Sequence, residues 1–572
     1  MAGEEEHLMQ PRPAPAAGAP AEPGVSRRRF LSGGAAATAL LLGAPAASLA
    51  HDHGHAETPP PPKSAQEQAA FDKAEAAHYE RFAEPPVVAG VDGVVDVTLR
   101  VVEVPITIRE STQTRTEITR TYNGQVPGPT ISAYPGDTIN VHFFNDLPKN
   151  TDAGCLDPNH HANPNTPHCF NTTNLHTHGL HVSPKVPSDA VLIEIPPLAE
   201  DPVRGKLDYC FALPKSHKPG THWYHAHKHG STALQLVNGM AGALIVKDLP
   251  GTEPMPGIKD LVFLIHETVG NDSSTDVYQC GGGCGVTSAY LVNGQYQPTV
   301  DIRPGEIQRW RFINATATPR GITNLTFTTA QTLIAVDGIY LPEPRSESAW
   351  PLAPGNRADY LVQFNTVGQT TVSKKQIPFP GCNIPEQVLV KVNVAGPELK
   401  MTLPGETPEL PRYLQKTLTA ANVTPESAAD TPDQTIIFNV ANQADCAGKF
   451  QINGVPFGPD APVITVPLGA TQIWEVQNSS GAPHPFHIHV NPFVVIEKNG
   501  VAVPPEQQYF QDTVLIRPQQ NGVNGSVKFM TTFDNFDGEF VIHCHILVHE
   551  DWGMMRKVVV QGPGVGPCVT IP

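Results

Sequence analysis

Apolar and polar residues alternate in three segments of the chain, and each segment follows the same turn motif. The motif is an aromatic or branched residue followed by Asn-Gly, and it occurs at residues 122–124, 292–294 and 452–454. In each copy a later Gly precedes an Asn by nine residues, and apolar positions alternate between them, as at Ile139, Val141 and Phe143. In the second copy the alternation is irregular, with apolar residues at Ile307, Trp310 and Phe312. This pattern indicates a half-buried strand after a tight turn, so the sequence predicts one β-hairpin element repeated three times.

The spacing of the repeat predicts three domains. Successive copies lie about 165 residues apart, which suits one Greek-key β-sandwich per copy better than a short solenoid unit. Only 16% of the residues are charged, whereas the 48 Gly and 59 Pro fit short strands joined by turns. We therefore expect an all-β protein with domains at residues 89–249, 250–396 and 397–572, whose edges fall at the turn residues near Pro250 and Gly396.

The first fifty residues are typical of an export signal. Residues 26–31 match the twin-arginine pattern, and an apolar run over residues 33–49 is followed by a small-x-small cleavage motif, Ser48-Leu49-Ala50. A membrane anchor is the alternative, but the run is short and only moderately hydrophobic for a spanning helix. We expect twin-arginine export to the periplasm or the cell exterior, with no membrane attachment after cleavage. Residues 51–88 should form a tail rich in His and Pro, with one helix over 65–82.

Net charge and cysteine content narrow the class of protein. The net charge of -17 comes from dispersed acidic residues without a basic stripe, which argues against nucleic acid as a partner. We expect a monomer. Of the nine cysteines, one is assigned to a metal below, and the other eight allow up to four disulfides of unknown pairing. Cys280 and Cys284 are expected to form a local disulfide rather than a zinc site.

Ten of the 24 histidines fall in four clusters, all in the first and third predicted domains. The clusters are His176-Thr177-His178, His225-Ala226-His227, His484-Pro485-Phe486-His487-Ile488-His489, and His543-Cys544-His545 with His549. A strand sends residues i and i+2 to the same face, so each His-x-His pair presents two imidazoles to one site. Eight imidazoles suit three coppers, two with three nitrogens and one with two, because imidazole is a favoured copper ligand. Two pairs in each domain place this cluster at the domain interface.

Cys544 belongs to a different site. It lies between the two histidines of its motif, so its side chain points to the other face of the strand. Together with His484, His549 and Met554 it supplies the two histidines, the thiolate and the weak axial methionine that mark a blue copper site. The backbone on either side of Cys544 then connects the blue copper to the three-copper cluster.

These motifs resemble all four copper motifs of the three-domain multicopper oxidases, and of the laccases in particular. Supporting phrases occur at residues 123–130, 353–359 and 512–514, so the resemblance runs from about residue 90 to residue 560. It implies three cupredoxin-like domains and four copper ions, one of type 1, one of type 2 and two of type 3. It also implies an oxidoreductase that takes single electrons from a reducing substrate and reduces dioxygen to water.

The resemblance implies a copper for each ligand. Type 1 takes His484, Cys544, His549 and Met554; type 2 takes His176 and His487; one type 3 copper takes His178, His225 and His545; and the other takes His227, His489 and His543.

The resemblance also implies acids that supply protons to dioxygen. Glu550 follows a ligand histidine and matches a family position associated with proton supply. Asp189 is the nearest counterpart of a second acid, although it lies farther from the first motif than in relatives, and an ordinary exposed loop carboxylate is the alternative. Three further histidines match no ligand position and are expected to have supporting or surface roles: His181, His222 and His229.

The sequence gives little indication of the reducing substrate. The chain has eight Met and no Met-rich insert of the kind that suits Cu(I), so a phenolic reductant is favoured over Cu(I) oxidation in copper tolerance. A copper nitrite reductase would split its catalytic copper between subunits, whereas here one chain supplies every ligand. A non-enzymatic copper-binding protein would need only the blue site. Dioxygen uptake with a phenolic donor separates these alternatives.

Overall fold

The computed structural model confirms an all-β protein, and the α-helices of its described residues are short. It describes residues 81–109, 114–156, 163–269, 275–278, 287–381, 384–411 and 431–571, together with residues 414, 415, 417 and 419. The expected signal at 1–50, the tail as far as residue 80 with nearly all of its predicted helix, and the Cys280/Cys284 pair lie outside these residues. Within the described part of the chain, no helix is long and apolar enough to cross a membrane.

The three predicted hairpin turns adopt one conformation. Asn123, Asn293 and Asn453 have φ angles of 56°, 52° and 52°, and the glycine after each also has a positive φ. Asn and Gly tolerate this left-handed region, which a two-residue hairpin turn requires. The Oδ1 atom of each Asn accepts a hydrogen bond from a strand N–H at 2.7, 2.9 and 2.6 Å, respectively. The sequence repeat is therefore a structural repeat.

The later Asn of each repeat is buried and fixes the loop that follows its strand. Asn145 Nδ2 donates to the main-chain oxygens of Asn171 and Ile195, both at 2.8 Å. In the third copy, Asn478 Nδ2 donates to Ala482 O at 2.7 Å. Asn314 does the same in the middle copy, at 2.9 and 2.7 Å. In the first and third copies these loops lead directly into histidine motifs, so the repeat positions the candidate ligands.

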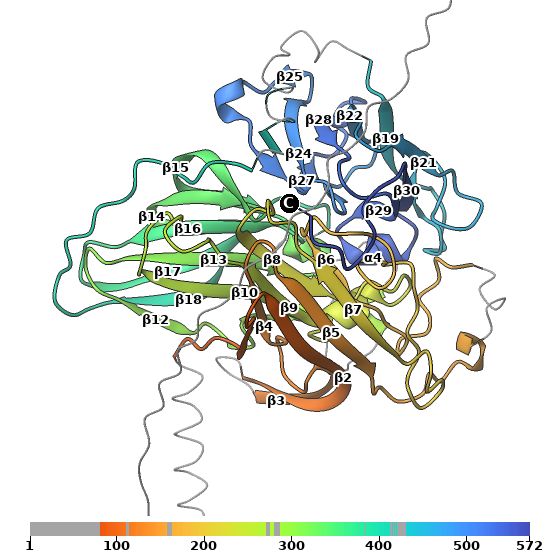
Figure 1. Ribbon diagram of the computed structural model, residues 1–572, viewed down its shortest axis with the longest axis horizontal. Helices are drawn as coiled ribbons and strands as arrows, with labels where there is room; N and C mark the ends of the chain where they lie inside the picture. Colours follow the sequence, from red (N-terminus) through yellow and green to blue (C-terminus); the bar gives the residue numbers. More distant parts are fainter. Residues whose placement is uncertain are drawn as a thin grey trace, which may run out of the picture. The chain divides into compact units, whose positions relative to one another are not determined.

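The first third of the chain forms two sheets with a core between them (Figure 1). One sheet has the order β3 (Thr114–Tyr122), β2 (Val94–Arg109), β5 (Thr138–Asn145) and β7 (Lys206–Ala212). The other has the order β1 (Val87–Ala89), β4 (Thr130–Ala133), β9 (Ala241–Val246), β8 (Gly220–His225) and β6 (His176–His178). Val97, Phe143 and Tyr224 belong to the core that the two sheets share. The short strands β6 and β8 carry three of the candidate ligands.

The middle third forms a single nine-stranded sheet instead of two separate sheets. Its order is β11 (Thr287–Val292), β10 (Lys259–Val269), β13 (Ile307–Ala315), β16 (Arg357–Gln363), β14 (Thr323–Val336), β17 (Gly368–Gln376), β18 (Gln387–Val394) and β12 (Thr299–Ile302), with β15 (Ile339–Leu352) paired to β14. Its core includes Trp310, Phe312 and Tyr360. Phe82 packs on Phe263 with ring centroids 4.6 Å apart, so the end of the expected tail is docked on this sheet.

The last third again forms two sheets. One has the order β20 (Phe450–Ile452), β19 (Gln434–Val440), β22 (Thr471–Asn478), β28 (Gly525–Thr532), β24 (Phe493–Lys498) and β25 (Val501–Ala502), with β26 (Phe510–Gln511) paired to β24. The other has the order β21 (Ile464–Pro467), β30 (Met555–Gln561), β29 (Gly538–Cys544), β23 (His484–Ile488) and β27 (Thr513–Ile516). Strands β23 and β29 are antiparallel neighbours that carry two histidine motifs side by side.

Buried carboxylates tie the thirds together. Asp512, from the last third, accepts two hydrogen bonds from the guanidinium of Arg357, in the middle third, at 2.8 and 2.7 Å. Asp551 ends helix α4 (Leu547–Asp551) and accepts the backbone N–H groups of Gly230 and Ala233, at 2.6 and 2.9 Å, at the start of helix α2 (Thr232–Val237). The first contact joins the middle third to the last third. The second joins the first third to the last third, where the histidine motifs meet.

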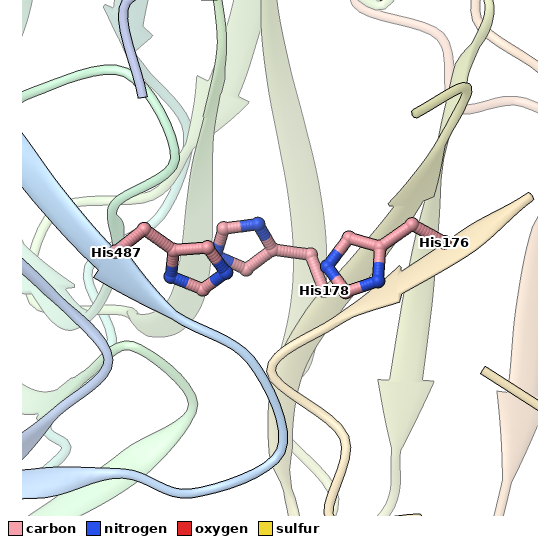
Figure 2. A group of neighbouring side chains, drawn as sticks. All are labelled: His176, His178 and His487. Carbon is pink, nitrogen blue, oxygen red and sulfur yellow. The ribbon is translucent and has the colours of Figure 1, made fainter. Parts of the chain in front are cut away.

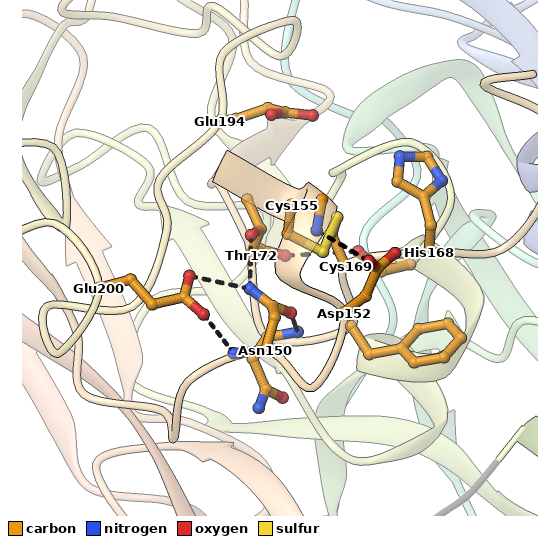
Figure 3. The surroundings of a disulfide bond; sticks show 12 residues. Asn150, Asp152, Cys155, His168, Cys169, Thr172, Glu194 and Glu200 are labelled. Carbon is orange, nitrogen blue, oxygen red and sulfur yellow. Dashed lines mark hydrogen bonds between the residues drawn. A yellow bond between two sulfur atoms is a disulfide. The ribbon is translucent and has the colours of Figure 1, made fainter. Parts of the chain in front are cut away.

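Disulfides further restrain the first and last thirds. Cys155 pairs with Cys169, Cys210 pairs with Cys568, and Cys446 is also disulfide-bonded. Figure 3 shows the first of these beside Asn150, whose Nδ2 donates to Thr172 and Glu200 at 3.1 Å. Cys544 is a free and buried thiol, as expected for a metal ligand.

Candidate metal centre

Two pairs of neighbouring strands bring the histidine motifs together. In the first third, β6 pairs with β8 so that His176 lies opposite His225. In the last third, β23 pairs with β29 so that His487 lies opposite His543. Figure 1 shows β6 and β8 next to β29 and α4, although the two pairs are some 300 residues apart in sequence. The predicted interface between the first and third domains is therefore where the histidines gather.

One histidine group joins His176 and His178 of β6 to His487 of β23 (Figure 2). The rings of His178 and His487 stack with centroids 3.9 Å apart, so a side chain of the first third lies directly against one of the last third. One ring nitrogen from each of the three residues lies within 4.8 Å of the others, close enough to share a metal ion. All three side chains are buried.

Two more groups complete the cluster. His178, His225 and His545 form one, and His227, His489 and His543 form the other. In the second of these, the Nε2 atoms of His227 and His489 each lie 3.2 Å from Nε2 of His543. The two groups reproduce the sets expected for the two type 3 coppers, and each combines residues of both domains.

Hydrogen bonds fix which ring nitrogen of His225 and of His487 faces inward. Nδ1 of His225 donates to Ala226 O at 2.8 Å, and Nδ1 of His487 donates to Asp512 O at 2.9 Å. The opposite nitrogen, Nε2, of both rings is buried and has no hydrogen-bond partner among the described residues. The same holds for Nε2 of His176 and Nδ1 of His178. Orphaned lone pairs that converge in a buried space are what a metal ion requires, so these side chains fit one.

The electrostatics of the cluster also favour metal binding. Burial lowers the pKa of His176, His225 and His545 well below the ordinary value, and the neighbouring imidazoles add to the effect. Burial likewise lowers the pKa of His227 to about 3. The rings are therefore neutral at physiological pH, which is the form that ligates metals.

Asp189 supports the ring of His176. Its Oδ2 lies 2.9 Å from His176 Nδ1, and its Oδ1 accepts the backbone N–H of Thr177 at 2.8 Å. Asp189 is only 2% exposed, which excludes the alternative of an exposed loop carboxylate. Burial raises its pKa to about 7, against the opposing effect of the Thr177 hydrogen bonds.

Two other carboxylates contact the cluster. Asp512 Oδ1 lies 3.3 Å from His178 Nε2. Glu550 Oε2 lies 3.4 Å from His543 Nδ1, and its Oε1 lies 3.7 Å from His227 Nδ1. Burial raises the pKa of Glu550 well above its usual range, and the charge of neighbouring Asp551 raises it further, so the protonated form of this carboxyl is favoured.

A separate group forms around Cys544. Its Sγ lies 3.4 Å from His484 Nδ1 and 3.7 Å from His549 Nδ1, and these two nitrogens are 3.1 Å apart. Burial raises the pKa of the thiol, so a bound cation must displace its proton. Met554 is fully buried in the same core cluster as Cys544, whereas Met555 belongs to a different cluster with Val191. Of the two methionines, Met554 is thus the one on the cysteine side.

The ring of His484 is oriented by Ser480. Ser480 Oγ lies 2.9 Å from His484 Nε2 and also 2.8 Å from Asn478 Oδ1, which can only accept. The hydroxyl therefore donates to Asn478 and accepts the Nε2 proton of His484, which leaves the lone pair of Nδ1 directed at Cys544. Asn478 is the Asn of the third repeat, so the repeat also sets this tautomer.

Two cavities reach the candidate ligands. One, of about 280 Å³, is bounded by His484 and His549 and has mostly apolar walls. The other, of about 310 Å³, reaches His227 from the far side, between the first and last thirds. The two groups of ligands are thus accessible from different cavities.

Sequence reasoning identified the histidines and the acids Asp189 and Glu550 but missed other groups that contact the histidines. Arg357 and Asp512 appeared only within motif phrases, and Asp551 and Ser480 were not singled out. Their contacts bridge residues far apart in sequence, so only adjacency to a ligand motif could have pointed to Asp551 and Ser480. Of the three additional histidines, His181 and His222 are buried and His229 is partly buried.

Comparisons with known proteins match the whole site. Family models described as multicopper oxidase match residues 104–153 with 165–251, 265–377, and 430–563. A laccase of Haloferax volcanii is 28% identical over 477 residues, which cover 77% of this chain and 78% of the relative. The multicopper oxidase mco of Staphylococcus aureus is 25% identical over 77% of this chain and 83% of its own. Among solved structures, a multicopper oxidase from Campylobacter jejuni, described as a metallo-oxidase, has a TM-score of 0.65 at 23% identity, with 84% of this chain and 95% of that chain covered.

Proposed function

This chain belongs to the multicopper oxidase family, so it is a copper oxidoreductase that uses dioxygen and a reducing substrate, and we propose that it is laccase-like, with a phenolic reductant and four coppers. The observation that carries the proposal is the convergence of eight buried imidazoles from two domains beside a separate Cys-His-His group. When bound, copper supplies one-electron redox chemistry and the binding of dioxygen.

We assign the ligands as the family resemblance implies, and the groups in which their nitrogens meet support the assignment. His178 falls in two of these groups and is given to a type 3 site. The type 2 site takes His176 and His487; the type 3 sites take His178, His225 and His545, and His227, His489 and His543; and the type 1 site takes His484, Cys544 and His549, with Met554 as the axial group. Met554 packs in the same hydrophobic core as Cys544, which supports Met554 over Met555 as the axial group.

Two acids hold the protons that dioxygen reduction consumes. Glu550 contacts His227 and His543, so a proton leaving its carboxyl is released next to the cluster. Asp189 contacts His176 on another side of the cluster. Reduction of one dioxygen to two waters takes up four protons, and a buried carboxyl with a raised pKa can take up a proton and deliver it without admitting bulk water.

Three alternatives fit the molecule less well. Cu(I) oxidation in copper tolerance would be favoured by thioether or carboxylate groups near the blue site, and the described residues that line the cavity there include neither. A copper nitrite reductase would need a second subunit to complete its catalytic copper, whereas one chain supplies all ligands here. A non-enzymatic copper carrier leaves the eight-imidazole cluster unexplained.

We also propose a location and an assembly state for the protein. The twin-arginine pattern at residues 26–31 supports export to the periplasm or cell exterior, since that route carries proteins already folded around a cofactor. The completeness of the ligand set in one chain supports a monomer.

A dioxygen electrode tests the proposal. Copper-loaded protein should consume dioxygen with a simple phenol, and more slowly with Cu(I) or bilirubin. Consumption of nitrite without dioxygen uptake would establish a reductase instead, and the absence of both activities would favour a copper carrier.

A further inference from the structure

We propose that the cavity beside His484 and His549 selects single-ring aromatic acids, and that Lys449 is the specificity-determining residue that binds their carboxylate. This inference rests on the proposed function, because it names the class of reductant. It concerns residues of this chain that are not metal ligands.

The cavity is formed by three separate segments. Val440, Lys449 and Phe450 come from the hairpin of β19 and β20, whose loop is closed by a hydrogen bond from Ala441 N to Lys449 O at 2.8 Å. A second wall is the loop 480–482, which the repeat Asn holds in place. The third wall, Phe379 and Pro380, belongs to the middle third of the chain. The cavity therefore lies between two domains and directly over the histidines of the cysteine site.

Aromatic and apolar walls fit a flat ring. Phe450 stacks on the ring of His549 with centroids 4.0 Å apart and an interplanar angle of 14°. Phe379 and Val440 supply further apolar surface. The volume of about 280 Å³ lies just below the usual range for small-molecule sites, which suits one substituted ring better than a four-ring molecule such as bilirubin.

The charge of the cavity favours an anion. Among the described residues that line it, Lys449 is the cationic side chain, and none is a carboxylate. The lysines of the described residues that form ion pairs with carboxylates are Lys185, Lys228, Lys528 and Lys557. Lys449 is not among them, so its ammonium is available to a ligand. A metal cation would be repelled by this charge and would find no carboxylate or thioether to replace its water. An aromatic acid satisfies both the apolar walls and the ammonium.

The orientation of the ring follows from these two anchors. With its carboxylate at Lys449 and its face on the apolar walls, a para-hydroxy acid directs its hydroxyl toward the histidines. With Cu(II) held by His484, Cys544 and His549, each bound molecule would lose one electron to the copper and its phenolic proton to solvent, and would become a phenoxyl radical. Four such electrons, with four protons, convert one dioxygen to two waters.

Charge-matched substrates and variants test the inference. We would compare 4-hydroxy-3-methoxybenzoate with its methyl ester, which keeps the ring and hydroxyl but removes the charge. Lys449→Ala should lower kcat/KM for the acid by about fivefold, the upper end for a solvent-exposed ion pair, and leave the ester unchanged. Lys449→Glu should lower it by roughly twentyfold, because repulsion replaces attraction. Lys391→Glu, an equal charge change at an exposed position of β18, is the control and should leave kcat/KM for both substrates unchanged.

Binding without turnover gives an independent readout. Isothermal titration calorimetry of the copper-loaded protein with 3,4-dimethoxybenzoate, which has no phenolic hydroxyl, should show Kd values that rise in the same order across the Lys449 variants. Gly481→Val should weaken the binding of the acid and of the ester alike. Gly481 lines the cavity and a Cβ there meets nothing within 4 Å, so a larger side chain can extend into the cavity.

The outcomes separate the inference from the proposed function. Suppose that acid and ester both drive dioxygen uptake with equal kcat/KM and that Lys449→Glu has no effect. This result would overturn the role of Lys449 but not the proposed function. Unchanged kinetics and binding in Gly481→Val would overturn the placement of the ring in this cavity. If neither aromatic drives dioxygen uptake, the proposed function fails, while calorimetry still reports whether aromatic acids bind at Lys449.

Discussion

Replacement of Asp189 by Asn tests how the cluster holds its metal at His176. Asp189 is 2% exposed, and its two oxygens face His176 Nδ1 at 2.9 Å and Thr177 N at 2.8 Å. Asn keeps the shape of Asp but has only one acceptor oxygen. Its amide NH₂ group would therefore face one of the two donors, His176 Nδ1 or Thr177 N. Loss of a charge-assisted hydrogen bond costs about 1.5–3 kcal/mol, and loss of such a carboxylate lowers metal affinity about 10- to 100-fold.

Copper retention measures this effect. Wild type and Asp189→Asn would be dialysed against graded chelator concentrations, and copper content and the type 2 signal in electron paramagnetic resonance would be recorded. The chain offers a matched control, because Asp208 also lies 2.8 Å from a ring nitrogen, His142 Nδ1, but its side chain is 82% exposed. Asp208→Asn should leave copper retention unchanged. The reasoning is refuted if Asp189→Asn keeps all its copper, or if both variants lose it equally.

Four further variants test separate parts of the site. Cys544→Ser should abolish a strong absorption near roughly 600 nm from copper–thiolate charge transfer while the other coppers stay bound, and a copper-loaded wild type without this band would disprove the blue site. Met554→Leu should keep the colour and raise the reduction potential, as redox titration would show, because a weak donor to Cu(II) is removed; an unchanged potential would exclude Met554 as the axial group. Glu550→Gln should slow steady-state dioxygen reduction but leave anaerobic stopped-flow reduction of the blue copper intact, and equal losses in both would indicate a structural role. Arg357→Met leaves Asp512 buried without its cation and should destabilise the fold by about 3–5 kcal/mol in denaturant unfolding, whereas a loss below about 1 kcal/mol would contradict the importance of this ion pair.

Local patterns in the sequence were sufficient for the fold class and for the sets of neighbouring histidines. The Asn-Gly turns and alternating strands depend on backbone preferences that act over a few residues, and His-x-His pairs on strands must share a face. The meeting of His178 and His487 across the domain interface was predicted from the number of histidine motifs in each domain and from the family resemblance.

Long-range contacts could not be predicted in the same way. The single nine-stranded sheet of the middle third depends on how β14 pairs with three other strands, which alternation does not encode. The burial of Asp189 depends on a loop that turns back onto β6, and its sequence, with two nearby prolines, equally suits an exposed loop. The role of Ser480 depends on a ring tautomer that Asn478 sets.

The stoichiometry of dioxygen consumption tests the central claim most directly. Copper-loaded protein would be given a limiting amount of a one-electron phenolic donor, with dioxygen uptake measured by electrode and hydrogen peroxide by a peroxidase-coupled assay. A cluster that completes four-electron reduction predicts one dioxygen consumed for every four donor molecules, with no peroxide. One dioxygen for every two donors, with peroxide as the product, would contradict the account.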